Sequence, residues 1–261
     1  MITVISVYNN RQIFNDCLSV SLSSQTAVFQ SILIDNTTGA NKCAAKVFNE
    51  VINRARGDFL LFCHQDVVFK NSLWLSDVEK ELALLTNPGV VGVAGCKEKT
   101  KGVFTNIVHG PNRTFAGEYR VTVPTKVQTV DECLFIVPQD IFSHIQFDEL
   151  TCFGWHFYAA DLCLSCILAG YTCYVIPVEL YHLSAGSSLD ISYYKTGRLL
   201  ANKYRSSFSS INTTCSTWRT KYSVAQYYMY LAKYAISNTK AYPFLKKYRN
   251  ELVGRLIDRK L

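Results

Sequence analysis

The 261-residue sequence predicts an α/β fold in which a mostly parallel central sheet is flanked by helices. Two observations lead to this prediction. Short apolar runs alternate with longer stretches of helical periodicity, which is the pattern of βαβ units. A change in charge then separates residues 1–189, the predicted α/β domain, from residues 190–261, which we predict to be a basic, Tyr-rich and mainly helical C-terminal extension.

The first part of the chain contains three predicted strands. Residues 2–8, 31–36 and 59–63 are short apolar or β-rich runs, as expected of strands that are buried on both faces of a sheet. Helices are predicted between these strands, at residues 12–22 and 42–55, and Gly57 closes the second of them. A further amphipathic helix over residues 73–85 is stopped by Asn87-Pro88-Gly89.

A polar segment interrupts the remaining strands. We predict strands at residues 90–95, 129–137 and 172–176, and a helix over residues 158–169 that Gly170 ends. From residue 97 to residue 126 the sequence is rich in Gly, Thr, Asn and charge. This composition predicts a long excursion over the surface, of the kind that forms a lid or an acceptor loop.

Composition narrows the class of protein. The chain is 49% hydrophobic and 18% charged, which excludes wholesale disorder. No window holds the roughly 18 uninterrupted apolar residues of a membrane span, and the N-terminal residues have the pattern of a strand, not of a signal peptide. We therefore expect a cytoplasmic protein whose ten cysteines are mostly free, buried thiols.

The excess positive charge is confined to the C-terminal extension. Residues 1–189 hold 13 Lys and Arg against 17 Asp and Glu, whereas residues 190–261 hold 14 against 3. Segments 222–234, 244–249 and 255–260 combine basic residues with Tyr and apolar residues. They could lie on the inner face of the cell membrane, or form a helical cap or a homo-oligomer contact. We expect no nucleic-acid binding, because no recognition helix or base-stacking motif accompanies the charge.

Polar residues stand directly after three of the predicted strands. They are Asn9, Asp35 and the run His64-Gln65-Asp66. Ligands of open α/β sheets bind beyond the carboxyl ends of the strands, so these positions predict a binding site. The carboxylate of Asp66 suits a hard divalent cation, although an acid after a strand can also cap a helix or a turn.

Two later residues are candidates for the same site. Asp161 stands near the start of a predicted helix, where a carboxylate serves as a general base or complements the helix dipole. The aromatic residues before it could bind the face of a sugar or belong to the core. His182 follows the last predicted strand and could be a metal ligand or a polar surface residue.

Together, these motifs resemble the family 2 glycosyltransferases with the GT-A fold, and in particular the bacterial subgroup with His-Gln-Asp after the strand, which is similar to the domain named for a streptomycin-biosynthesis protein. The resemblance covers about residues 1–190. It rests on Ile34-Asp35-Asn36, Asn49, Ala55-Arg56-Gly57-Asp58, Phe62-Cys63-His64-Gln65-Asp66-Val67, Val130-Asp131-Glu132, Phe147-Asp148-Glu149, the segment from Gly154 to Asp161, and His182-Leu183-Ser184-Ala185-Gly186-Ser187.

The resemblance implies a role for each motif. Asp35 would bind the nucleotide base or ribose, with Asn9, His64, Gln65 and Asp131 also in contact with the nucleotide-sugar. Asp66 and His182 would hold the metal, and Asp161 would be the catalytic base. Trp155 and His156 would belong to the acceptor loop.

These roles predict an inverting transferase that moves a sugar from a nucleoside-diphosphate sugar to a glycan or lipid-linked hydroxyl acceptor. The cation would be Mn²⁺ or Mg²⁺, and an imidazole ligand favours Mn²⁺. Two departures from the family pattern leave a second interpretation open. His64 replaces the first acid of the DXD motif, and Ala160 replaces the Glu of the usual Glu-Asp pair. A catalytically silent protein that binds sugar nucleotides or serves as a scaffold would also fit these changes.

Overall fold

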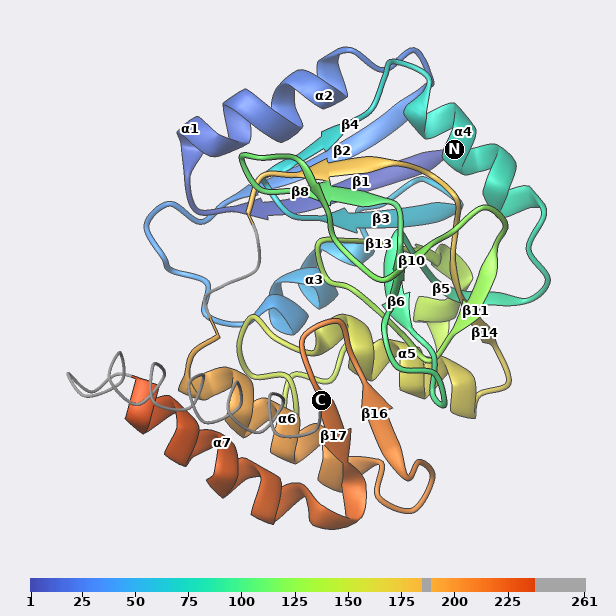
Figure 1. Ribbon diagram of the computed structural model, residues 1–261. Coiled ribbons are helices and arrows are strands. Elements are labelled where there is room, and N and C mark those ends of the chain that lie inside the picture. The colour runs from blue at the N-terminus through green and yellow to red at the C-terminus, as the bar shows by residue number, and fades with distance from the viewer. Residues whose placement is uncertain (185–188, 238–261) are drawn as a thin grey trace, which may run out of the picture.

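The computed structural model describes residues 1–184 and 189–237, and its centre is a mixed seven-stranded sheet (Figure 1). The strand order is β11-β14-β5-β13-β3-β1-β2, in which β11 and β13 run antiparallel to their neighbours and the other five strands share one direction. The predicted α/β fold with a mostly parallel sheet is confirmed. The strands are β1 (Ile2–Tyr8), β2 (Phe29–Asp35), β3 (Phe59–Cys63), β5 (Pro88–Gly92), β11 (Thr125–Val127), β13 (Leu134–Pro138) and β14 (Thr172–Val175).

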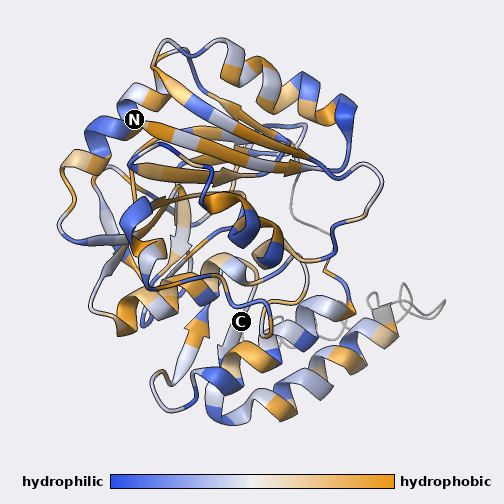
Figure 2. Ribbon diagram, turned by 180° about the vertical axis from the view of Figure 1, so that it is seen from behind, coloured by the Kyte–Doolittle hydropathy of each residue, from blue (hydrophilic) through white to orange (hydrophobic). Residues whose placement is uncertain are grey.

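Helices cover both faces of this sheet, as Figure 1 shows. One face packs against α1 (Arg11–Phe14), the π-helical stretch η1 (Asn15–Ser19), α2 (Val20–Ser23) and α4 (Trp74–Ala83), and the other against α3 (Ala44–Ile52) and α5 (Tyr158–Leu168). The strands contribute apolar side chains to both layers, for example Leu61 to one and Phe62 to the other. The central strands are accordingly hydrophobic along most of their length in Figure 2.

The predicted strands at 90–95 and 129–137 each divide into two. The chain leaves the large sheet after Gly92 and forms β6 (Ala94–Cys96) beside β12 (Thr129–Val130), which ends before Asp131. A Cβ on Gly92 would lie 2.6 Å from the Cβ of Val130, so glycine permits this close approach. The second break places Asp131 and Glu132 at the carboxyl-terminal edge of the sheet.

The segment from residue 97 to residue 126 differs from the predicted irregular excursion. It forms β7 (Val103–Thr105), β8 (Ile107–His109), β9 (Thr114–Phe115), β10 (Tyr119–Arg120) and β11. β11 joins the seven-stranded sheet. The other four strands, with β4 (Val67–Phe69), β6, β12 and β15 (Leu180–His182), build two further four-stranded sheets, β10-β7-β6-β12 and β4-β15-β8-β9. The strands are only two or three residues long and pair with distant segments, so the sequence shows no local signal for them.

The C-terminal extension packs against α5. It consists of α6 (Ile191–Lys203), a hairpin of β16 (Ser210–Asn212) and β17 (Thr217–Arg219), η3 (Thr220–Tyr222) and α7 (Ser223–Ser237); the short 3-10 helix η2 (Gln139–Ser143) lies earlier in the chain. Leu200, Tyr204 and Trp218 are buried in the same apolar core as α5. The hairpin was not predicted. The boundary at residue 189 stays a prediction, and segments 244–249 and 255–260 lie outside the described residues.

Two sequence-based expectations concern cysteines and membrane spans. All ten cysteines are free thiols, and eight of them are buried, whereas Cys215 is exposed. In the described part of the chain, no helix has the length and apolar character to cross a membrane.

Candidate functional site

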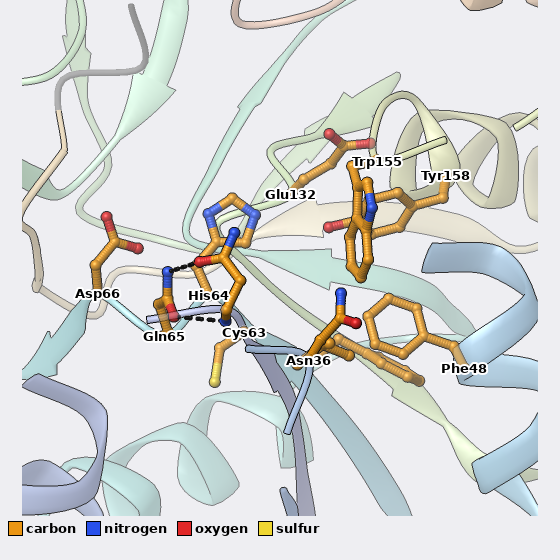
Figure 3. A pocket seen from close by; sticks show the side chains of 12 residues that line it. Asn36, Phe48, Cys63, His64, Gln65, Asp66, Glu132, Trp155 and Tyr158 are labelled. Atoms are coloured by element: carbon orange, nitrogen blue, oxygen red, sulfur yellow. Dashed lines mark hydrogen bonds between the residues drawn. The ribbon is translucent and has the colours of Figure 1, made fainter. Parts of the chain in front are cut away.

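A cavity of about 370 Å³ opens at the carboxyl ends of β1, β2 and β3, where the sequence predicts a binding site. In Figure 3, the polar side chains of His64, Gln65 and Asp66 lie on one side of the pocket, and the rings of Phe48, Trp155 and Tyr158 on the other. The pocket is lined by Val7, Asn9, Asn36, Phe48, Phe62, Cys63, His64, Gln65, Asp66, Glu132, Trp155 and Tyr158. It therefore offers both polar groups and aromatic surface to a ligand.

Gln65 joins the ends of two adjacent strands. Its Oε1 accepts hydrogen bonds from the backbone N–H groups of Asn9 and Asn10, both at 2.9 Å, and its Nε2 donates to Oδ1 of Asn9 at 2.7 Å. Dashed lines mark bonds of this network in Figure 3. The amide of Gln65 thus holds the run that contains His64 and Asp66 against the turn after β1.

His64, Asp66 and His182 form a cluster that could hold a metal ion. One ligand atom from each residue lies within 4.8 Å of the others, and within residues 1–184 and 189–237 no other such group occurs. His182 is 116 residues from Asp66 in sequence, but β15 pairs antiparallel with β4 and places its Nε2 3.1 Å from Oδ1 of Asp66. The backbone N–H of Ser184 also donates to the Asp66 carboxylate, at 3.2 Å.

The protonation states in this cluster follow from its contacts. Burial raises the pKa of Asp66, but the hydrogen bonds and charges of its partners, chiefly His182, lower it more, so the net pKa is well below its usual range. Burial lowers the pKa of His182, but its bond to Asp66 raises it above the ordinary value. Burial also lowers the pKa of His64 and favours the neutral imidazole that binds metals. Two imidazoles and a carboxylate suit a divalent ion such as Mn²⁺.

A second cavity of about 230 Å³ adjoins the first one and shares His64, Glu132 and Trp155 with it. Its wall is aromatic and partly supplied by the C-terminal extension. Residues that line this cavity and not the first include Asp131, His156, Phe157, His182, Tyr193, Thr213, Thr214 and Cys215. The predicted acceptor-loop residues Trp155 and His156 thus both line this cavity, and Trp155 also lines the first one.

Asp131 is held in place by two donors. The Thr214 hydroxyl, from the loop of the β16–β17 hairpin, donates to its carboxylate, and so does the backbone N–H of Cys133, at 2.9 Å. Burial raises the pKa of Asp131, but these hydrogen bonds lower it more. The aspartate therefore lies close to the predicted metal ligands and is tied to the extension.

Glu132 is a site residue that the sequence interpretation missed. It lines both cavities, and its Oε1 atom is buried without a hydrogen-bond partner. Burial and the charge of Asp131 raise the pKa of this carboxyl, although backbone N–H groups at Ala159, Tyr158 and Phe157 lower it in part. The available signal was its place beside Asp131 in an acidic pair directly after a strand.

Asp161, the predicted catalytic base, lies outside the lining of both cavities. Its side chain is 2% exposed. Oδ1 accepts hydrogen bonds from Nζ of Lys203 at 2.7 Å and from the hydroxyl of Tyr204 at 3.0 Å. The carboxylate is thus paired with a cation and lies outside the lining of both cavities, and its role as the base stays a prediction.

Asp35 lies outside the lining of the first cavity, whereas its neighbour Asn36 is part of it. Its carboxylate accepts hydrogen bonds from the hydroxyl and the backbone N–H of Thr37, and it pairs with Arg11. These contacts, with Thr37 first, lower the pKa of Asp35 to about 2. Asp35 is therefore an ionised residue at the end of β2, next to a lining residue.

Comparison with known proteins relates this geometry to a family. The model of a family described as "Glycosyltransferase like family" matches residues 3–182, which is more than half of the chain. The chain belongs to this glycosyltransferase-like family. The match ends at His182, a residue of the cluster, and leaves the C-terminal extension outside.

One relative of this glycosyltransferase-like chain is the protein called "ATP synthase subunits region ORF 6" from Fuscovulum blasticum. The two are 26% identical over 191 residues, which is 71% of this chain and 75% of the relative.

Solved structures share the fold. TarS from S. aureus, in complex with UDP-GlcNAc, matches with a TM-score of 0.54 and 16% identity over 78% of this chain and 66% of that one. The mannosyltransferase PcManGT from Pyrobaculum calidifontis, with GDP-Man and Mn²⁺, matches with a TM-score of 0.55 and 11% identity over 96% of this chain and 79% of that one. GalNAc-T7, with UDP, GalNAc and Mn²⁺, matches with a TM-score of 0.54 and 9% identity over 78% of this chain and 47% of that one. At these identities the comparison shows the GT-A fold alone, and the chain spans less than two thirds of the TarS chain.

Proposed function

We propose that this glycosyltransferase-like chain transfers a sugar, with inversion, from a nucleoside-diphosphate sugar to a hydroxyl group of a glycan or lipid-linked acceptor. The observation that carries the proposal is the cluster of His64, Asp66 and His182 where two cavities meet. The structures of TarS, PcManGT and GalNAc-T7 contain nucleotides or nucleotide sugars, two of them with Mn²⁺. We also assign the chain to the subgroup with His-Gln-Asp after the strand.

The donor would occupy the first cavity. Phe48 and Trp155 supply ring surface for a base or a sugar, and Asn36 supplies an amide next to the ionised Asp35. His64 and Asp66 lie at the opposite side of the pocket (Figure 3) and would lie near the diphosphate. A donor in this orientation places its sugar near Glu132 and the second cavity.

The cluster fits a metal by the chemistry of its donor atoms. Asp66 and His182 would hold Mn²⁺ or Mg²⁺, with His64 beside them. A bound divalent ion supplies positive charge that stabilises the departing diphosphate. His64 replaces an acid of the family motif, and a neutral imidazole can still act as a ligand, so this departure is compatible with metal binding.

Calorimetric titration tests the donor site. UDP, GDP and dTDP are titrated into the protein with and without Mn²⁺, and the experiment is repeated with Asp66→Ala. We expect metal-dependent binding of one nucleotide and its loss in the variant. Asp16→Ala is the matched control, because Asp16 is exposed on η1 and its carboxylate accepts hydrogen bonds from Gln12 in the neighbouring helical turn. Equal binding with and without metal would reject the metal assignment.

A silent protein that binds sugar nucleotides is the second candidate. It is favoured by Ala160 and by the engagement of Asp161 with Lys203, because both remove an expected acid from the site. Such a protein would bind one nucleotide in the titration but release no nucleotide from the matching sugar donor in the presence of hydroxyl acceptors. Turnover in that assay would exclude it.

We also propose that α7 contacts an anionic membrane that carries the acceptor. Its exposed residues include Val224, Tyr228 and Met229, with Tyr222 just before the helix and the basic residues Lys221 and Lys233 near them. Each Lys or Arg near such a surface contributes about 1 kcal/mol. Vesicles with and without phosphatidylserine test this in cosedimentation with wild-type protein and Tyr228→Glu. Unchanged cosedimentation of the variant, or a dimer in sedimentation velocity that uses this face, would reject membrane contact.

A further inference from the structure

Three carboxylates line the two adjoining cavities in the described part of the chain: Asp66, Asp131 and Glu132. Asp66 is bonded to His182 and Ser184. Asp131 is bonded to Thr214 and Cys133. Oε1 of Glu132 is the carboxylate oxygen that is buried there without a hydrogen-bond partner. A buried polar atom without a partner is costly, so an unpaired carboxylate oxygen at a cavity indicates a function in ligand binding or chemistry.

The position of Glu132 supports the same conclusion as its unpaired Oε1 atom. It belongs to the lining of both cavities, together with His64 and Trp155. It follows the short strand β12 at the break before β13, which allows two successive acids, Asp131 and Glu132, to reach the same region. A group at this junction can approach a donor in one cavity and an acceptor in the other.

The start of α5 orients the Glu132 carboxylate. Phe157 precedes the helix in a left-handed conformation with φ +67°, which is rare for a bulky residue. Backbone N–H groups of Phe157, Tyr158 and Ala159 interact with the Glu132 carboxylate and favour its charged form. The backbone N–H groups at the start of the helix thus contact an acid from the break between β12 and β13. The helix's own Asp161 accepts a hydrogen bond from Lys203 instead.

We propose that Glu132 is the catalytic base, which rests on the transferase function proposed above. The acceptor hydroxyl would transfer its proton to the Glu132 carboxylate while its oxygen forms a bond to the anomeric carbon of the donor. The bond from that carbon to the phosphate oxygen breaks, and its electron pair leaves with the nucleoside diphosphate. The carboxylate becomes a carboxylic acid, so charge and protons balance in the step.

The electrostatics of Glu132 suit this role. Burial and Asp131 raise its pKa, so the carboxylate is a stronger base than an ordinary glutamate. A base is most effective when its pKa lies near the working pH. Asp66 has the opposite property, because its contacts hold its pKa low and favour a permanently charged ligand.

The test measures binding and turnover in parallel for wild-type protein, Glu132→Gln, Glu132→Asp and Asp161→Asn. Binding is measured by calorimetry with the nucleoside diphosphate and Mn²⁺. Turnover is measured as nucleotide release from the matching donor (UDP-GlcNAc, GDP-mannose or dTDP-glucose) with water and with methyl glycosides as hydroxyl acceptors. Glu149→Gln is the control for an amide replacement, because Glu149 is exposed and contacts Asn49 away from both cavities.

We expect Glu132→Gln to bind the nucleoside diphosphate like the wild type. Its turnover of the donor should be about 10²- to 10⁴-fold slower, because this is the usual contribution of a general base. The acidic limb of its pH–rate profile should also disappear, and Glu132→Asp should recover part of the rate. Turnover of Glu132→Gln close to that of Glu149→Gln would overturn the assignment but leave the transferase function intact. Failure of wild-type protein to bind or turn over any donor would instead overturn the transferase function, and the assignment with it.

Discussion

Two acids lie at the start of α5, Asp161 within the helix and Glu132 next to its first backbone N–H groups, and their surroundings differ in one essential respect. On the side of the extension, Asp161 is fully buried and bonded to Lys203 and Tyr204. On the cavity side, Glu132 has a buried oxygen without a partner. A fold neutralises a buried carboxylate when its role is structural, and leaves one unpaired at a cost when it is needed for chemistry. The comparison therefore assigns a structural role to Asp161 and a role in ligand binding or chemistry to Glu132.

The largest effect is expected from removing Lys203, the cation bonded to Asp161. Lys203→Met leaves Asp161 and Asp148 without their shared ammonium group, whose Nζ lies 2.7 and 2.8 Å from the two carboxylates. We expect a loss of about 3 kcal/mol in the free energy of unfolding, at the lower end for a buried pair because Lys203 is partly exposed. Urea denaturation measures this, with Lys195→Met as the control at an exposed position of α6. Equal stability of both variants would contradict the structural role.

Packing of the extension gives a smaller effect on the same side. A Cβ on Gly197 would lie 2.4 Å from ring atoms of Trp218, which is fully buried. Gly197→Ala should lower the free energy of unfolding by about 2 kcal/mol, as overpacking does in well-packed cores. Gly154→Ala is the control, because its Cβ would have its closest neighbour at 3.9 Å. If Gly197→Ala proved as stable as Gly154→Ala, α6 would not pack as described.

Asp148, the second carboxylate bonded to Lys203, and Glu132 should also differ in the sign of their pH dependence. Asp161 shares a raised pKa with Glu132, because its burial outweighs its contacts with Lys203 and Tyr204. Burial raises the pKa of Asp148, but Lys203 and Thr151 lower it more, so its stabilising contribution is lost as the pH falls below about 4. The pKa of Glu132 is raised, so the folded state loses stability as the pH rises above about 4.5.

Thermal denaturation across this pH range measures both contributions. Asp148→Asn should reduce the acid-side loss of stability, and Glu132→Gln should reduce the alkaline-side loss. Parallel pH curves for the wild type and both variants would contradict the electrostatic contrast between Asp148 and Glu132.

The sequence predicts most of the sheet but only part of the site, for physical reasons. Strand 59–63 and helix 158–169 are defined by local apolar patterns and match β3 and α5 within one residue. The strands within residues 97–126 depend on distant partners, and the break at residue 131 depends on packing at Gly92.

The same distinction applies to the site residues. His64, Asp66 and His182 stand at strand ends, and the sheet brings them together. The motif predicts the base at Asp161, whereas the direction of a helical side chain relative to a cavity is a tertiary property that a sequence motif does not contain. Lys203, the partner that neutralises Asp161, comes from an extension whose packing could not be predicted.

Location of the metal in a crystal tests the central claim most directly. Crystals grown with Mn²⁺ and the nucleoside diphosphate that binds would be measured at the manganese absorption edge. We predict an anomalous peak for a Mn²⁺ ion coordinated by Asp66 and His182, with the nucleotide in the cavity beside Trp155. A nucleotide bound elsewhere, or a map without a peak at this cluster, would contradict the proposed donor site.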